Sequence, residues 1–448
     1  MTVTAAKPSP KRISLPHLAM LVPWVAVVIG SVGPVRDNSY LWHIAAGEIQ
    51  AETGRVLTSD PFSFTMSGEP WLTQSWLVEL LYGFAQDISG PGFTGVMIMV
   101  VAALTFTGVG LLAYRWSSSL TATAVVLFLS TVLLVPAIHP RPAVFSYPLM
   151  VLVILAWDSK TLRWTLPFLM WLWASVHGSF AIGLVYMALR IISSREWKAM
   201  PQVIVAGLAT LMTAHGLGVL TILADFAVAR PHLALISEWR TPDFLTPALA
   251  PYLVGMVLVI YGSMKGRLTT ATLWVIVPFL ALGMSATRAV PSAWIALIPM
   301  VAMALGGLSW KWGRGFPLPM AIVVTAVVVL FPFLFASPVV IDEERFPVEA
   351  ALHLDDVRTF HDDSAGGYLI YTDHFSEGVF IDDRVELYLD RIDDYVAIRS
   401  GRQPWEPVFE QDRIEQALLK TGEPMVGWLT AAGWQEIHRD HFYVVLRP

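Results

Sequence analysis

The chain has 448 residues, of which 55% are hydrophobic and only 14% are charged. Ordinary soluble domains carry roughly 25% charged residues, and so much apolar surface does not fit inside one water-soluble core. These proportions exclude an ordinary soluble enzyme and indicate a protein that crosses a lipid bilayer several times. Because cysteine is absent, disulfides, thiolate metal sites and cysteine nucleophiles are excluded as well.

Charge is divided unevenly along the chain. Residues up to Val339 contain 19 Lys and Arg against 12 Asp and Glu, a balance of +7, whereas the rest contain 10 and 23, a balance of −13. We therefore expect a basic membrane domain, residues 1–339, followed by an acidic soluble domain, residues 340–448. Nucleic-acid binding is not expected, because a phosphate-binding surface needs clustered cations.

Apolar runs separated by charges, prolines and glycines predict about eleven membrane helices. The first run lacks a convincing cleavage site and is expected to remain as a span. Several runs are shorter than the ~20 residues of a perpendicular span, so tilted, broken or re-entrant helices are expected among them. In chain order the runs are 15–33, 93–114, 120–137, 143–157, 164–177, 179–193, 200–223, 249–264, 269–286, 289–307 and 317–337.

The distribution of basic residues predicts the orientation of these spans. With a cytoplasmic N-terminus, the inside loops hold thirteen Lys and Arg and the outside loops hold six. Cytoplasmic loops are enriched in Lys and Arg, so this orientation is favoured. An odd number of spans then places residues 340–448 outside the cytoplasm.

Two regions are too polar to be spans. One is the first outer loop, residues 34–92, and the other is the C-terminal region. The alternation of apolar and polar residues in that region predicts a small α/β domain. The predicted strands are Gly367–Thr372, Gly378–Asp382, Gln435–Arg439 and Phe442–Arg447, and the predicted helices are Leu387–Arg399 and Arg413–Lys420.

In this topology, five polar residues lie at the outer ends of the spans: Asp37, Arg141, His177, Glu238 and Arg288. Ionisable groups near a bilayer are costly, so such residues usually pair with one another or serve a functional site. Their position at one depth predicts that they share a site at the outer face.

Each acidic or imidazole group has a functional and a structural interpretation. Asp37 has the chemistry of a general base or a metal ligand, and it also suits a helix cap or a partner of Arg36. Glu238 is either a second catalytic carboxylate or a partner of Arg240. His177 is either a polar ligand of the substrate or a histidine hydrogen-bonded in a helix break.

The two arginines suit a phosphate or pyrophosphate leaving group, since a guanidinium stays charged and makes forked hydrogen bonds. Extension towards lipid headgroups is the alternative for both. Arg288 lies between two apolar segments and is therefore a stronger candidate for phosphate binding than Arg141. No Walker loop, dinucleotide-binding glycine motif or nucleophile elbow is present, which disfavours an ATP-driven pump or a nucleotide-sugar enzyme with a Rossmann domain.

Motifs along nearly the whole chain resemble those of bacterial GT-C-type membrane glycosyltransferases, which depend on polyprenyl-phosphate sugars. They occur in the first outer loop, in the later outer loops and in the C-terminal region. In chain order they are Asp37 with Leu41-Trp42-His43-Ile44-Ala45-Ala46-Gly47, Ser59-Asp60-Pro61-Phe62, Trp76-Leu77-Val78-Glu79, Arg141-Pro142, Trp173-Ala174-Ser175-Val176-His177-Gly178, Glu238-Trp239, Thr287-Arg288-Ala289-Val290-Pro291, Gly366-Gly367-Tyr368-Leu369-Ile370 and Val379-Phe380-Ile381-Asp382-Asp383-Arg384.

The resemblance implies a multi-span enzyme of the bacterial inner membrane. Such an enzyme moves a sugar by inverting displacement from a polyprenyl-phosphate carrier to a glycan, lipid or protein of the cell envelope. Asp37 matches the acidic residue that acts as base or metal ligand in these enzymes, with Glu238 as a second catalytic group. Arg141 and Arg288 would hold the carrier phosphate, and substrate contacts are expected from the two histidines His43 and His177.

The resemblance also has a departure that concerns the metal. Asn38 follows Asp37 where many members of the group have a second acidic residue. The sequence therefore leaves open whether a divalent ion, Mg²⁺ or Mn²⁺, binds at Asp37.

Two other functions fit the same residues: a transporter or flippase for a lipid carrier, and a membrane scaffold without catalysis. A transporter is expected to show inverted repeats or paired broken helices, and the sequence contains neither. The C-terminal domain would select the acceptor, cover the mouth of the site, or only stabilise the protein.

Overall fold

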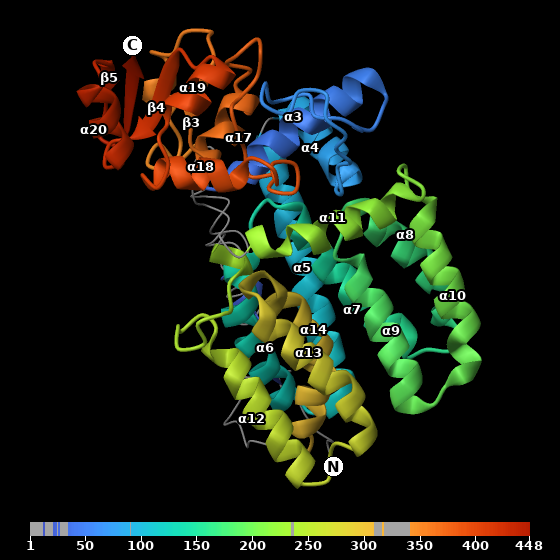
Figure 1. Ribbon diagram of the computed structural model, residues 1–448. Coiled ribbons are helices and arrows are strands. Elements are labelled where there is room, and N and C mark those ends of the chain that lie inside the picture. The colour runs from blue at the N-terminus through green and yellow to red at the C-terminus, as the bar shows by residue number, and fades with distance from the viewer. Residues whose placement is uncertain are drawn as a thin grey trace, which may run out of the picture.

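The computed structural model consists of a bundle of helices with a mixed α/β domain at one end (Figure 1). It describes residues 12–13, 21–24, 26, 35–89, 91–233, 237–308, 316–317 and 341–448. The first and last predicted spans, 15–33 and 317–337, lie almost entirely outside these ranges. Within them, two short strands, β1 (Arg12–Ile13) and β2 (Phe316–Pro317), pair in antiparallel fashion.

Three described helices are long and apolar enough to cross a membrane: Phe93–Ser117, Leu120–Ala137 and Thr287–Ala304. They indicate an integral membrane protein, while the predicted total of about eleven spans stays a prediction. Other predicted runs form shorter helices. The bundle consists of α5 (Pro91–Ser117), α6 (Leu120–Leu134), α7 (Ser146–Trp157), α8 (Leu166–Val176), α9 (Phe180–Ser194), α10 (Met200–Ala209), α11 (Gly218–Leu233), α12 (Ala250–Met264), α13 (Leu273–Ser285) and α14 (Val290–Ala304).

The predicted continuous segment 200–223 is wrong. α10 ends at Ala209, the chain turns, and α11 begins at Gly218. Gly216 lies in this turn with a φ of 55°, a left-handed conformation that a glycine adopts without strain. His215 is held there because its Nε2 lies 2.7 Å from the carbonyl oxygen of Thr73. The apolar pattern predicts one span here, but polar contacts in the turn divide the segment into two helices.

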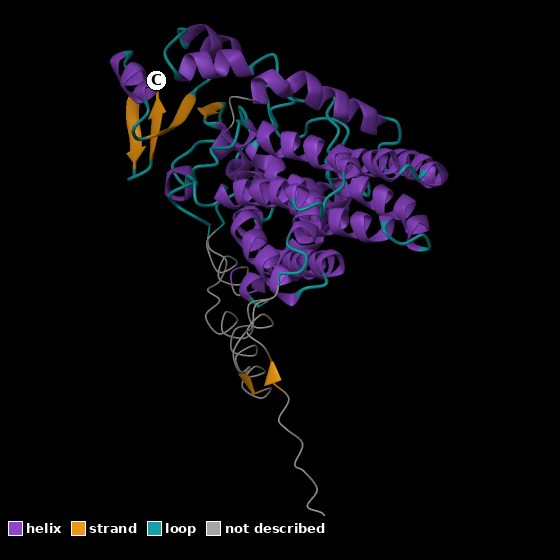
Figure 2. Ribbon diagram, turned by 90° about the horizontal axis from the view of Figure 1, so that it is seen from below, coloured by secondary structure: helices purple, strands orange, loops and turns teal. Residues whose placement is uncertain are grey.

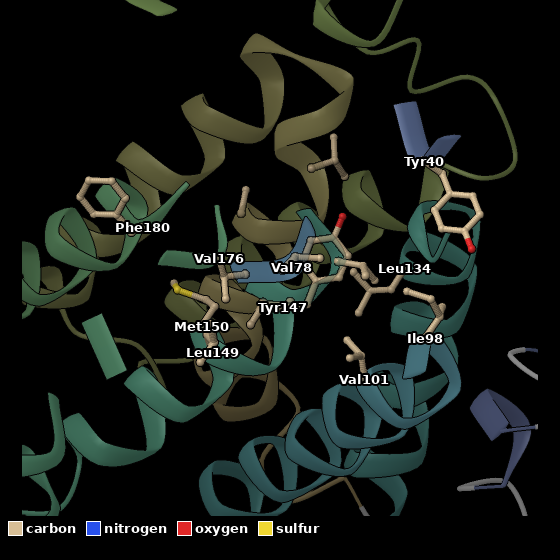
Figure 3. Close-up of a cluster of buried hydrophobic side chains, with 14 of the residues drawn as sticks. Tyr40, Val78, Ile98, Val101, Leu134, Tyr147, Leu149, Met150, Val176 and Phe180 are labelled. Atoms are coloured by element: carbon tan, nitrogen blue, oxygen red, sulfur yellow. The ribbon is translucent and has the colours of Figure 1, made fainter. Parts of the chain in front are cut away.

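The interior of the bundle is apolar, and α14 is its most buried long helix. Figure 3 shows part of this core, where Leu149 and Met150 of α7 lie near Val176 at the end of α8. On α14, the fully buried Trp294 donates from its indole nitrogen to the hydroxyl of Ser130, at 2.8 Å. A buried indole needs such a partner, so this contact removes the cost of burying its N–H group.

The first outer loop contains two helices, α3 (Asn38–Thr53) and α4 (Trp76–Ser89), which pack against each other beside the C-terminal domain (Figure 1). They approach closely at Gly47 and Gly83, where any side chain would overlap with the facing backbone. Next to this contact lies the fully buried Glu79. Its carboxylate bonds to His43 Nδ1 at 2.9 Å and to Gln50 Nε2 at 2.8 Å.

The C-terminal domain is a four-stranded sheet with helices around it (Figure 2). The strand order is β3-β4-β6-β5, in which β3 and β4 are parallel and the other pairs are antiparallel. The elements are α16 (Val348–Ala351), β3 (Thr359–His361), α17 (Asp363–Tyr371), α18 (Ile392–Arg399), α19 (Glu406–Asp412), β4 (Gln416–Lys420), α20 (Pro424–Ala431), β5 (Gln435–Arg439) and β6 (Tyr443–Arg447).

Predictions for this domain are partly confirmed. The predicted strands Gln435–Arg439 and Phe442–Arg447 form as β5 and β6. The predicted helix Leu387–Arg399 forms only over Ile392–Arg399, as α18. The predicted strand Gly367–Thr372 is wrong, because the Asp362 side chain accepts from Ala365 N at 2.9 Å and starts helix α17. The predicted helix Arg413–Lys420 is also wrong. Its apolar residues form β4, buried between β3 and β6, so tertiary pairing overrides the local pattern.

The C-terminal domain packs directly on the first outer loop. A side chain at Gly367 of α17 would overlap with the Asn38 carbonyl oxygen of α3. Residues next to this contact are joined as well, because Val35 pairs with Ile341 as a parallel β-bridge and Arg36 Nε lies 2.6 Å from Asp342. The start of α3, which carries Asp37, is thereby fixed to residues from the far end of the chain.

Candidate active site

A cavity of about 630 Å³ lies between the helical bundle and the C-terminal domain. Five of the six predicted site residues line it: His43, Arg141, His177, Glu238 and Arg288. The C-terminal domain provides much of the remaining wall, mainly residues 381–386 and part of α18. A second cavity of about 240 Å³, within the C-terminal domain, contains none of the predicted residues.

Arg141 lies between two carboxylates. Its Nε is 2.5 Å from Asp37 Oδ2, and its Nη1 is 2.7 and 2.6 Å from the two carboxylate oxygens of Glu238. Burial lowers the pKa of Arg141, but Asp37, Glu238 and Asp383 outweigh burial, and the pKa lies above its usual value. The guanidinium therefore remains charged, and it joins three segments that are far apart in the sequence.

The local sequence explains how Arg141 reaches this position. Arg141 is extended, with a φ of −103°, because Pro142 follows it and disfavours a helical conformation. His139 approaches the same oxygen of Asp37 as Arg141 does, with Nε2 at 3.5 Å from Oδ2. Burial lowers the pKa of His139, so this imidazole is neutral near pH 7 and Arg141 is the cationic partner of Asp37.

Two structural interpretations of Asp37 are wrong. Asp37 occupies the cap position of α3, but its side chain makes no capping hydrogen bond. Arg36 pairs with Asp342 instead of with Asp37. Asp37 does not itself line the cavity; it reaches the cavity through Arg141, while its Oδ1 is buried without a hydrogen-bond partner among the described residues. The predicted role as base or metal ligand stays a prediction.

Arg288 is another arginine that lines the cavity. It lies in a short 3₁₀ helix (Thr287–Ala289) ahead of α14, with its guanidinium carbon 4.4 Å from the ring centroid of Trp239. Within the described part of the chain, no carboxylate lies at ion-pair distance from it. Stacking on an indole stabilises the charge and leaves N–H groups for an anion.

The two predicted histidines are both held by neighbours. Ser179 N–H donates to Nδ1 of His177 at 3.1 Å, so Nε2 carries the proton in this arrangement and is the group available as a donor. This is the hydrogen-bonded helix break that the sequence suggested, and the residue also faces the cavity. His43 bonds to Glu79 through Nδ1 and stacks on Trp42, with ring centroids 3.6 Å apart.

Asp383, to which the sequence gives no predicted role, lies in the part of the cavity wall that the C-terminal domain forms. One of its oxygens accepts from the Ser39 hydroxyl, and the other accepts from Trp42 Nε1 at 2.6 Å. Burial raises the pKa of Asp383 to about 6. The run Asp382-Asp383-Arg384 was visible in the sequence, but no local signal places it against α3, more than 340 residues away.

Arg384, next to Asp383, is fully buried and anchors this segment. Its Nη2 lies 2.8 Å from Asp60 and 2.6 Å from Asp382. Its guanidinium also lies over the ring of Trp71, 4.5 Å from the centroid. Asp60 accepts from the backbone N–H groups of Phe62 and Ser63, as is typical of a turn at Asp-Pro, and its ion pair with Arg384 joins the first outer loop to the C-terminal domain.

The arrangement does not fit a divalent metal at Asp37. The Arg141 guanidinium already lies between the Asp37 and Glu238 carboxylates, where a shared cation would lie. Across the described ranges, no group of three His, Asp or Glu side chains is placed to hold a metal ion.

The structure of this chain resembles solved structures of other membrane proteins. No family model and no curated protein matches the chain. Among solved structures, the oligosaccharyltransferase AglB from Archaeoglobus fulgidus, in complex with an inhibitory peptide and a dolichol-phosphate, matches with a TM-score of 0.57 at 12% identity, covering 90% of this chain and 69% of AglB. ArnT from Cupriavidus metallidurans, in the apo state, matches with a TM-score of 0.53 at 13% identity, covering 96% of this chain and 97% of ArnT.

An apo oligosaccharyltransferase of Archaeoglobus fulgidus also matches, with a TM-score of 0.54 at 11% identity, covering 91% of this chain and 69% of that one. The chain has the GT-C fold. At these identities the likeness concerns architecture, and it confirms the architecture that the sequence motifs predicted. In this GT-C fold, the cavity at the junction of the bundle and the C-terminal domain is the candidate active site.

Proposed function

We propose that this protein is a membrane glycosyltransferase that moves a sugar from a polyprenyl-phosphate carrier to a hydroxyl of a cell-envelope acceptor outside the cytoplasm. The observation that carries the proposal is the pair of guanidinium groups, Arg141 and Arg288, in one cavity between an apolar bundle and a polar domain. The GT-C fold supports it, and so does the dolichol-phosphate bound by AglB.

The donor's chemistry suits this position. A polyprenyl tail dissolves in the bilayer, so its phosphate lies at the interface, where the cavity is expected in the proposed orientation. Arg288, stacked on Trp239 and without a carboxylate partner in the described chain, is the group we assign to the phosphate. Arg141 lines the same cavity, where Asp37 and Glu238 hold it in place and offset its charge.

The reaction requires charge stabilisation at the departing phosphate. An acceptor oxygen attacks the anomeric carbon from the face opposite the phosphate, and the bond from that carbon to the phosphate oxygen breaks, inverting the anomeric configuration. Cations fixed beforehand at the phosphate stabilise the negative charge that develops as it leaves. To the Nε2–H group of His177, which lines the same cavity, we assign a hydrogen bond to the sugar or the phosphate.

Binding of polyprenyl phosphate to the purified protein in lipid nanodiscs tests the donor assignment. Hydrogen bonds to a charged group contribute about 1.5–3 kcal/mol, so Arg288→Gln is expected to weaken binding about 10- to 150-fold. The exposed Arg55 of the first outer loop provides the matched control, and Arg55→Gln is expected to bind like the wild type. Equal affinity of the Arg288→Gln variant and the wild type would contradict the assignment.

Turnover separates a transferase from the alternatives. Asp37→Asn is expected to reduce sugar transfer about tenfold or more, because Arg141 loses one of its two charged partners and its position in the cavity then depends on Glu238 alone. Asp87→Asn, at an exposed position of α4, is expected to leave transfer unchanged. The readout is the envelope glycan and lipid profile, measured by mass spectrometry in cells expressing each variant at equal levels. A wild type that binds the carrier without changing any envelope product would indicate a lipid-carrier transporter.

A further inference from the structure

The carboxylates around Arg141 differ in what they are bonded to. Asp37 and Glu238 are both ion-paired with Arg141. Within the described cavity wall, Asp382 is paired with Arg384. Asp383 is different, because each of its oxygens accepts a hydrogen bond from a neutral donor on α3 and no cation lies at ion-pair distance in the described chain.

We propose that Asp383, supplied by the C-terminal domain, is the base that takes the proton from the acceptor hydroxyl. The inference rests on the proposed transfer of a sugar and names the proton acceptor of that reaction. Each carboxylate oxygen has two lone pairs, and the Ser39 and Trp42 contacts use one on each oxygen. The remaining lone pairs are available to a hydroxyl in the cavity.

The proposed base and the groups assigned to the phosphate come from different parts of the protein. Arg288 and His177 come from the bundle, the side from which a lipid-linked donor enters. Asp383 lines the same cavity from the C-terminal domain, the polar part of the protein, from which we expect a water-soluble or headgroup hydroxyl to enter. An acceptor between the two would have its oxygen next to a base and the anomeric carbon on its other side.

The base is held rigidly, as general-base catalysis requires. The residue after Asp383, Arg384, is fixed by its ion pairs with Asp60 and Asp382. Gly366 allows α17 to touch the Ile381 carbonyl oxygen, where a side chain would overlap with it. The segment that carries Asp383 is thereby immobilised from both sides.

The electrostatic surroundings suit a base that works near neutral pH. Burial, Asp382 and Asp37 raise the pKa of Asp383, whereas Arg141 and the Ser39 hydroxyl lower it, and the result is about 6. At pH 7 the group is mainly ionised and is a stronger base than an ordinary aspartate. Below a pH of about 6 it is protonated and cannot accept a proton.

The step balances in atoms and electrons. The acceptor O–H bond breaks, and its proton goes to a carboxylate oxygen of Asp383. The acceptor oxygen forms a bond to the anomeric carbon, and the bond from that carbon to the phosphate oxygen breaks, with its electron pair leaving on polyprenyl phosphate. Asp383 then returns the proton to water.

The experiment measures transfer and binding separately with the full-length protein in nanodiscs. Donors are a panel of polyprenyl-phosphate-linked hexoses and pentoses, acceptors are an extract of envelope lipids and glycans, and released polyprenyl phosphate is quantified by mass spectrometry from pH 4.5 to 8. Asp383→Asn retains groups that can bond to Ser39 and Trp42, so folding is expected to persist. The control is Asp390→Asn, an exposed position in the same domain.

Removal of a general base typically costs about 10²- to 10⁴-fold in rate, and this loss is expected for Asp383→Asn. Its affinity for polyprenyl phosphate should stay within about twofold of the wild type, because proton transfer from the acceptor takes no part in donor binding. The wild-type rate should fall below a pH of about 6, and the residual rate of the variant should lack this acid limb. Asp383→Glu should keep the limb, and Asp390→Asn should behave like the wild type.

Two results would overturn the inference and leave the proposed function intact. One is an Asp383→Asn variant with the wild-type rate and acid limb, and the other is loss of the acid limb from the pH profile of Glu386→Gln instead. Glu386 is the competing carboxylate, since it also lines the cavity, bonded to Trp71 Nε1 at 3.4 Å. A wild type that neither binds polyprenyl phosphate nor uses any donor would overturn the proposed function, and the inference with it.

Discussion

Replacement of Arg384 by alanine tests how the C-terminal domain is held on the first outer loop. The side chain is completely buried, and so are those of its partners Asp60 and Asp382. Alanine would leave two buried carboxylates without a cation and would remove the stacking on Trp71. Removal of one partner from a buried ion pair costs about 3–5 kcal/mol, so we expect a loss of that size in the free energy that holds this junction together.

Native-state proteolysis measures this quantity when opening and closing are faster than cleavage. A loss of about 3–5 kcal/mol corresponds to cleavage faster by on the order of 10²- to 10⁴-fold. The exposed Arg402 provides the control, and Arg402→Ala should change the rate less than about threefold. The triple variant Asp60→Asn, Asp382→Asn, Arg384→Met should recover most of the stability, because no charge is left unpaired. A rate for Arg384→Ala within about threefold of the wild type would refute the reasoning.

Two further substitutions test the packing around the site. Gly367→Ala places a methyl group against the Asn38 carbonyl oxygen, so it should destabilise the contact between α17 and α3 by about 1–3 kcal/mol. Gly427→Ala, with open space around it, should be neutral or stabilising. The melting temperatures of the two variants test this difference. Glu79→Ala leaves His43 and two other buried groups without their acceptor and should cost about 3 kcal/mol or more, with Glu79→Gln milder; equal melting temperatures for the two Glu79 variants would contradict this account.

Much of the helical architecture could be predicted because apolar runs have few alternatives in a bilayer. The runs that became α5, α6 and α14 are examples, and the outer-face assignment brought Arg141, Glu238 and Arg288 to one cavity. The break between α10 and α11 could not be predicted from apolarity, because polar contacts in the turn decide it.

The C-terminal domain was less predictable for a different reason. The residues of α17 and β4 have local patterns that suit either a helix or a strand, and their neighbours in the fold decide between them. The contacts of Asp383 with Ser39 and Trp42 join residues more than 340 positions apart, and no single-sequence pattern encodes such pairs. The predicted site residues therefore did not include Asp383, which lies in the part of the cavity wall that the C-terminal domain forms.

The direct contact between α3 and α17 limits how this protein can be recombined with relatives. Residues 35–89 and 341–448 form one continuous wall, with glycines at the contact that tolerate no side chain. A chimera that takes the C-terminal domain from another protein and keeps its own first outer loop would combine two surfaces that have not been matched. Exchange of both segments together preserves this contact.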